Sequence, residues 1–228
     1  DSGQLEAMGV AVADLNQDRL PDFAITSYQE VRLTKTSATG SYAGPLWVDD
    51  IASLAIDAPN QVYGWGAELG DLDNDRDADL VIGFGYWAMF TGNVDRRLQP
   101  DGLWLQDEVG RFTDVAPDWG ANDPLSTRGL VLADIDGNGF LDLVKRTLDS
   151  GGGGGPQGVR YVARCDDSAW LSLTLLQGDA NPRAIGARVT VTSPDGHEQT
   201  RWVTAGSTSM YSSGPPEVHF GLAQDDQV

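Results

Sequence analysis

Three acidic segments share one spacing of oxygen-bearing side chains, and they are the part of the chain best suited to chemistry. The segments begin at Asp14, Asp71 and Asp134. With that Asp as position 1, carboxylate or amide side chains recur at positions 3, 5 and 9. A hard cation such as Ca²⁺ takes about six to eight oxygen ligands, and alternate positions of a tight loop can direct their oxygens at one point. A backbone carbonyl at position 7 can complete the shell.

This register gives the candidate calcium ligands directly, with position 7 contributing its carbonyl oxygen. They are Asp14, Asn16, Asp18, Leu20 and Asp22 in loop one, Asp71, Asp73, Asp75, Asp77 and Asp79 in loop two, and Asp134, Asp136, Asn138, Phe140 and Asp142 in loop three. The carboxylates of loop two repel one another by up to roughly 1 kcal/mol per close pair even in water, so a cation stabilises this loop. The sequence therefore predicts Ca²⁺ at up to three sites.

Other readings of the loops account for less of the pattern. Solvated hairpin tips are the simplest alternative, but they do not explain three loops in one register, each with a Gly five residues ahead of the first Asp. Mg²⁺ prefers few protein ligands, and Zn²⁺ prefers Cys and His, which the loops lack. An EF-hand requires Glu at position 12 between two helices. Position 12 here is Ile25, Ile82 or Lys145.

The residues that flank the loops predict strands. Val10 and Val12 before loop one, and Phe23 and Ile25 after it, alternate with small residues as half-buried strands do. Each unit therefore reads as strand, acidic loop, strand and a long connection with further β-like sequence. Units of about sixty residues built from short strands indicate propeller blades or a similar radial array. We expect an all-β fold with propeller-type blades in residues 1–157 and a small β module in residues 158–228.

The second part of the chain lacks acidic loops and alternates polar with apolar residues instead. A turn at Asp195-Gly196 lies between two alternating segments, which predicts a β-hairpin. The glycine run Gly151–Gly155 separates the two parts as a loop or linker. Three tryptophans are expected to pack between blades rather than to form a sugar-binding platform, namely Trp65, Trp87 and Trp104.

Composition restricts the classes of partner. The 228 residues carry 34 acidic and 15 basic side chains, a formal net charge of −19. Such a surface repels nucleic acid and anionic lipid. No apolar run is long enough to insert into a membrane. Cys165 is the one cysteine, so the chain cannot form an internal disulfide. The sequence has no Gly-x-Ser-x-Gly motif, and we predict no catalytic residues.

The loop pattern, Asp-x-Asp/Asn-x-Asp/Asn-x-x-x-Asp after a Gly-led strand, resembles the FG-GAP (VCBS-type) repeat over residues 5–150. These repeats build integrin α-subunit propellers and occur in many secreted bacterial proteins. The resemblance implies a β-propeller with Ca²⁺ between two strands of each blade. Three repeats leave the ring incomplete, to be closed by blades elsewhere, by degenerate blades or by partner chains. Loop one departs from the pattern at Arg19 and Pro21.

The C-terminal stretch resembles the ASPIC/UnbV module, which follows FG-GAP repeats in the cartilage acidic protein family and its bacterial relatives. The segments that carry this resemblance are Gly186-Ala-Arg-Val-Thr-Val, Arg201-Trp-Val-Thr-Ala-Gly and Ser212-Ser-Gly-Pro-Pro-Glu-Val-His-Phe-Gly-Leu. The family pattern continues past Phe-Gly-Leu, so a truncated module is expected.

Together the two resemblances imply a secreted or cell-surface calcium-binding adhesion module with a protein or glycan partner. Two alternatives stay open. One is a structural subunit of an extracellular assembly or filament, formed by self-association through unpaired strand edges. The other is a propeller enzyme acting on polysaccharide.

Overall fold

The computed structural model describes residues 7–27, 31–36, 47–49, 63–85, 99–123, 125–148, 158–164, 166–178, 180–206 and 213–228. Within these ranges the chain is all-β, as predicted, apart from the one-turn helix α1 (Ala116–Trp119). Trp87, Cys165 and Gly151–Gly155 lie outside the described residues. No helix in the described part is long and apolar enough to cross a membrane.

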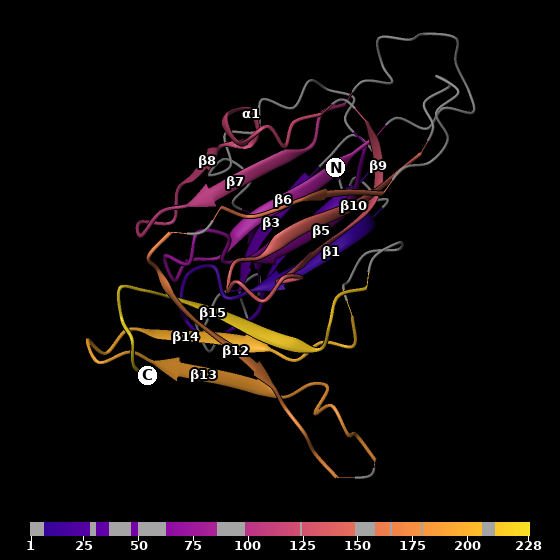
Figure 1. Ribbon diagram of the computed structural model, residues 1–228. Helices are drawn as coiled ribbons and strands as arrows, with labels where there is room; N and C mark the ends of the chain where they lie inside the picture. Colours follow the sequence, from indigo (N-terminus) through magenta and orange to yellow (C-terminus); the bar gives the residue numbers. More distant parts are fainter. Residues whose placement is uncertain are drawn as a thin grey trace, which may run out of the picture.

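Three antiparallel sheets carry the acidic loops, and in each of them neighbouring strands follow one another in the sequence (Figure 1). Sheet one contains β1 (Ala7–Ala13), β2 (Asp22–Ser27), β3 (Val31–Thr36) and β4 (Trp47–Asp49). Sheet two contains β5 (Gly64–Gly70), β6 (Asp79–Phe84), β7 (Gly102–Gln106) and β8 (Phe112–Asp114). Sheet three contains β9 (Ser126–Ala133), β10 (Asp142–Leu148) and β11 (Gly158–Tyr161). None of these described sheets closes on itself.

Each acidic loop joins the first two strands of its sheet, as the strand–loop–strand prediction required. The residue before position 1 pairs with position 9 in all three sheets, as in Ala13 with Asp22 and Gly70 with Asp79. Burial alternates along β1, as expected for a strand with one face in the core. By contrast, every residue of β6 is buried, because sheet two packs between the other two sheets.

The first strands of the three sheets lie side by side, with β1 against β5 and β5 against β9. Gly9 and Gly66, each five residues before the first Asp of its loop, permit this approach. A Cβ added at Gly9 would come 2.3 Å from the carbonyl oxygen of Trp65, and one at Gly66 would press on Leu130. Trp65 and Trp104 are each only 4% exposed, which confirms that both pack in the core.

The C-terminal module consists of two antiparallel strand pairs with a small core of their own. β12 (Ala169–Thr174) pairs with β15 (Glu217–Ala223), and β13 (Arg188–Thr192) pairs with β14 (Glu198–Trp202). The predicted hairpin is confirmed, since the Ser193 N–H donates to His197 O across a turn in which Gly196 has φ 87°. β11, at the predicted start of the module, pairs with β10 in sheet three, so the module's own strands begin at β12.

A fully buried lysine fastens sheets two and three together. Lys145 Nζ lies 2.6 Å from Asp101 Oδ2 and 2.5 Å from Asp123 Oδ2. The Thr127 hydroxyl also donates to Asp101 at 2.8 Å, and the Tyr161 hydroxyl donates to Asp123. Burial raises the pKa of Asp101 to about 6, and the neighbouring ammonium group limits the rise. The ammonium therefore favours the charged form of both carboxylates, of which that of Asp101 is buried.

Removing this ammonium should be costly, because it leaves a buried carboxylate without its partner. We expect Lys145→Ala to lower the free energy of unfolding by about 3–5 kcal/mol, as measured by denaturant titration at constant calcium concentration. Arg111→Ala serves as the control, since Arg111 pairs with Asp107 at the surface and such pairs contribute at most about 1 kcal/mol. Similar losses for the two variants would contradict the structural role of Lys145.

Candidate metal centre

The first Asp of each acidic loop organises the loop backbone. Both carboxylate oxygens of Asp14, Asp71 and Asp134 accept N–H groups, from positions 5 and 6, at 2.8–3.0 Å. Position 5 closes a smaller turn, since its side-chain oxygen accepts the N–H of position 7 in all three loops. The repeated sequence spacing is therefore a repeated hydrogen-bond pattern.

The Asp at position 9 fastens each loop to the third strand of its sheet. Asp22, Asp79 and Asp142 are all fully buried. One oxygen of each accepts the N–H of position 2, at 2.8, 2.7 and 3.3 Å respectively. The other oxygen accepts an N–H at or just beyond the third strand, from Thr36, Gln106 and Ala163. Substitution at this position would release the loop and the third strand together.

Loop two brings three carboxylates to one point. Asp71, Asp73 and Asp79 each place an oxygen within 4.8 Å of the others. Oδ1 of Asp73 is buried and has no hydrogen-bond partner. Burial raises the pKa of Asp71 to about 7, and burial together with the charge of Asp75 raises the pKa of Asp73 to about 6. Burial also raises the pKa of Asp79 well above its ordinary value.

This arrangement fits a divalent hard cation. All three donors are oxygens, one buried oxygen lacks a partner, and the charged forms of the carboxylates are disfavoured without a counter-charge. Within the described residues, loops one and three bring no comparable set of carboxylates together. Loop two is therefore the best candidate metal centre of the three predicted from the sequence.

The other candidate ligands of loop two serve as hydrogen-bond acceptors. Asp75 Oδ1 accepts the N–H of Asp77, and Asp77 Oδ1 accepts from Gln17 of loop one at 2.9 Å. Burial, followed by repulsion from Asp75, raises the pKa of Asp77 to about 6. Loops one and two are thus in direct contact through their polar side chains.

In loop three, an arginine side chain provides the positive charge beside the carboxylates. Nη2 of Arg160, from β11, lies 2.6 Å from Asp142 Oδ2 and 3.1 Å from Asp136 Oδ2. The remaining predicted ligands of loop three are Asp134, Asn138 and Phe140. The oxygens of Asp134 accept backbone N–H groups, and Asn138 Oδ1 accepts the N–H of Phe140. The Phe140 side chain is buried. Arg160 could not be predicted from the loop pattern, because it lies 18 residues beyond Asp142 and outside that pattern.

Loop one keeps its polar side chains within local hydrogen bonds. Asn16 Nδ2 donates to Asp18 Oδ2 at 3.2 Å, and Asp18 Oδ1 accepts the N–H of Leu20 at 2.9 Å. Burial raises the pKa of both Asp14 and Asp22. Two of its predicted ligands are therefore buried carboxylates, although no third carboxylate joins them in the described residues.

Position 6 of every loop contacts the C-terminal module, which lies against the loops (Figure 1). Arg19 pairs with Glu198, and Arg76 Nη1 pairs with Asp195 at 3.0 Å and with Asp225 at 3.1 Å. In loop three, Gly139 packs so closely on the Trp170 indole that a Cβ would collide with the ring.

The two arginines explain a departure from the repeat pattern. Position 6 has positive φ in all three loops, at 65° for Arg19, 89° for Arg76 and 87° for Gly139. A side chain in this region costs roughly 1–2 kcal/mol, which is why glycine is usual there. Ion pairs with the module offset part of that cost. An arginine at a position that favours glycine was the available sequence signal for a long-range contact.

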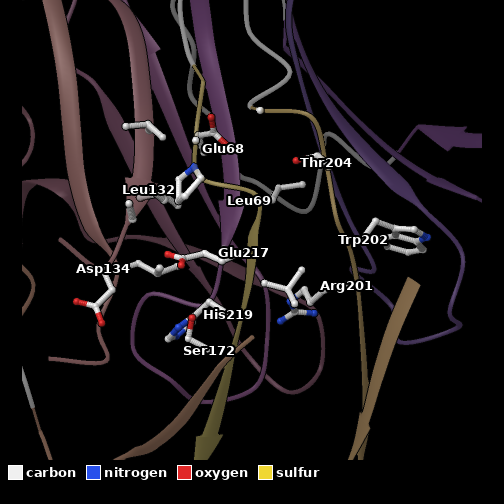
Figure 2. Close-up of a pocket in the computed structure, with 18 of the residues that line it drawn as sticks. Glu68, Leu69, Leu132, Asp134, Ser172, Arg201, Trp202, Thr204, Glu217 and His219 are labelled. Atoms are coloured by element: carbon white, nitrogen blue, oxygen red, sulfur yellow. The ribbon is translucent and has the colours of Figure 1, made fainter. Parts of the chain in front are cut away.

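A small polar cavity of about 150 Å³ lies between β5, β9 and the module. Its lining includes Arg201, Glu217 and His219 of the module, Glu68 of β5 and Asp134 of loop three, all labelled in Figure 2. Its volume is below the roughly 300–1,000 Å³ of typical ligand pockets. Burial and the charge of Arg201 lower the pKa of His219 to about 4, so its imidazole is neutral at pH 7.

The raised pKa of Asp71 predicts how the metal-free protein responds to pH. Its folded-state pKa of about 7 lies above the ordinary value of 3.8, so the folded protein binds more protons than the unfolded chain between these values. Its stability should therefore fall as pH rises through this window. From pH 5 to pH 8 we expect the Asp71 contribution to reduce the free energy of unfolding by about 2–3 kcal/mol.

Denaturant titrations in metal-free buffer at the two pH values would measure this change. Asp71→Asn cannot titrate and should show a shallower pH dependence than the wild type. Asp167→Asn, at an exposed site, should keep the wild-type dependence. An unchanged dependence in Asp71→Asn would show that this carboxylate is not the source.

Comparison with known proteins identifies one part of the chain. Residues 177–228 match the family described as ASPIC and UnbV. None of the curated proteins matches the chain. The family match lies in the segment that contains β13, β14 and β15. The match supports the resemblance stated for the C-terminal module, and the resemblance of residues 5–150 to FG-GAP repeats stays a prediction. Residues 177–228 are therefore similar to the ASPIC and UnbV family.

Proposed function

We propose that the chain is an extracellular calcium-binding module that serves adhesion or binding, with Ca²⁺ stabilising its loops. The observation that carries the proposal is the convergence of Asp71, Asp73 and Asp79 in loop two, with a buried Asp73 oxygen that has no partner. A bound Ca²⁺ supplies the positive charge that these carboxylates need to stay ionised. The proposal assigns no catalytic residue.

Calcium suits this centre better than other common cations. Its shell is irregular and accepts carboxylates and carbonyls together. Asp75 and the carbonyl of Asp77 follow in the same loop and are the next candidate ligands. Extracellular modules function with Kd values of about 10⁻⁴–10⁻³ M, because calcium is abundant outside cells. A site of three side-chain carboxylates in a short loop is compatible with that range.

The three loops are proposed to differ in their need for calcium. In loop three, Arg160 already bonds Asp136 and Asp142, so a metal would have to displace a guanidinium group. In loop one, Asp14 and Asp22 are buried acceptors, and a metal would add to existing hydrogen bonds. Loop two is the site at which calcium has the largest effect.

A propeller-like arrangement is part of this proposal. Three consecutive antiparallel sheets, with their first strands β1, β5 and β9 side by side, support it. In a propeller, the first strands of the blades surround a central axis. A protein or glycan partner would bind to the face or to the C-terminal module.

Self-association is a second candidate, and one observation favours it. Sheet three has three described strands where the other two have four, and β11 is at its edge among the described residues. An edge strand can accept a strand from another chain. Light scattering with and without chelator would test self-association. A monodisperse monomer in the presence of calcium would contradict it.

Thermal unfolding across a calcium titration, with Mg²⁺ as the control ion, tests the main proposal. Ligand at 100 times its Kd stabilises by about 2.7 kcal/mol, which corresponds to a rise in Tm of roughly 5–10 °C for a chain of this size. Asp73→Ala should abolish most of the rise.

Two further variants make the titration specific. Asp136→Ala should reduce the calcium-dependent rise less than Asp73→Ala does, because Arg160 occupies loop three. Asp167→Ala, at an exposed site in the C-terminal part, should leave it unchanged. Equal responses from the three variants, or no rise in the wild type, would show that the loops are ordinary solvated turns.

A further inference from the structure

We infer that the C-terminal module is a calcium-coupled cover of loop two, so that docking of the module and calcium binding strengthen each other. The inference rests on the proposed calcium site. It concerns residues outside the loop pattern, namely those through which β14, β15 and the turns of the module hold the metal-binding loop in place.

The backbone of β15 lies directly against a candidate ligand. The N–H of Gly221 donates to Asp71 Oδ2 at 3.1 Å. A Cβ added at Gly221 would come 2.2 Å from that oxygen and 2.4 Å from the Cα of Asn74. Only glycine permits this approach. The module therefore orients an oxygen of the proposed centre through one of its own amides.

A second set of contacts holds Asn74, at position 4 of loop two. This residue is fully buried with φ 59°. Its Nδ2 donates to Gly139 O of loop three at 3.0 Å, so its Oδ1 is free to accept from His219 Nε2 at 2.8 Å. Its backbone carbonyl accepts the N–H of Ala223 at 2.8 Å. β15 thus fixes the left-handed residue between two candidate ligands, Asp73 and Asp75.

Opposite charges face each other across the interface between loop two and the module. Arg76 of loop two projects to Asp195 and Asp225 of the module. On the module side, Arg201 of β14 donates to Thr200 O and to Gln199 Oε1, and the charges of Asp71 and Asp14 favour its charged form. Three carboxylates still outweigh one divalent cation, so the attraction for Arg201 persists when calcium is bound.

These contacts indicate that docking of the module and calcium binding at loop two favour each other. An undocked loop two would lose the bonds that fix Asp71 and Asn74, and it would have to order itself before binding a cation. Docking removes that requirement and raises calcium affinity. Because coupling between two sites is reciprocal, calcium must then strengthen docking by the same factor.

Calorimetric titration of the full chain with CaCl₂ measures the first direction. The test variant is Asp195→Asn with Asp225→Asn, which removes both partners of Arg76 and leaves every loop ligand in place. The matched control is Asp167→Asn with Asp226→Asn, which makes the same charge change at two exposed sites on the C-terminal side. We expect calcium affinity to fall about fivefold in the test variant and to change less than twofold in the control.

Hydrogen exchange of backbone amides measures the other direction. The amides of Gly221 and Ala223, which donate into loop two, should exchange more slowly in the wild type when calcium is added. The hairpin amide of Ser193, which bonds within the module, should not respond.

The outcomes separate this inference from the proposed function. A wild type that does not bind calcium overturns both. A wild type that binds calcium, with test and control variants of equal affinity and no added protection of Gly221 and Ala223, overturns the coupling and leaves the calcium site standing.

Discussion

The buried aspartate at position 9 is the interaction on which the rest of the architecture depends. A carboxylate in the core is unfavourable unless its oxygens are hydrogen-bonded. Asp79 meets this condition by accepting one N–H from its own loop and one from β7. Three strands are therefore held in register by a single side chain. The same arrangement at Asp22 and Asp142 explains why three sheets of different sequence share one loop geometry.

The carboxylates that organise the loops are also the candidate metal ligands, and the loops differ in what balances their charge. Loop three uses Arg160, whose guanidinium bridges Asp136 and Asp142. Loop two concentrates Asp71, Asp73 and Asp79 and raises their pKa values instead. A repeated motif can thus remain constant in backbone geometry while its electrostatics diverge. The number of loops with the pattern is therefore an upper bound on the number of metal sites.

Features encoded by neighbouring residues could be predicted from the sequence, and those formed between distant residues could not. The strand–loop–strand units, the hairpin at Asp195-Gly196 and the burial of Trp65 all follow from local spacing and side-chain type. The bond from Gly221 to Asp71 joins residues 150 positions apart, and that from Lys145 to Asp101 spans 44. No periodicity reports such pairs, because their proximity depends on how the sheets and the module pack.

The two residues that depart from the repeat pattern at position 6 indicate where the loops contact the C-terminal module. Arg19 and Arg76 stand at positive φ, where a side chain is unfavourable, and both pair with carboxylates of the module. The charges of Asp71 and Asp14 in the loops in turn favour the charged form of Arg201 in the module. Such pairs of opposite charges across the interface favour one docked orientation, because a shifted module would place like charges together. In a chain with a net charge of −19, the few arginines at this interface therefore have a large influence on how the two parts fit together.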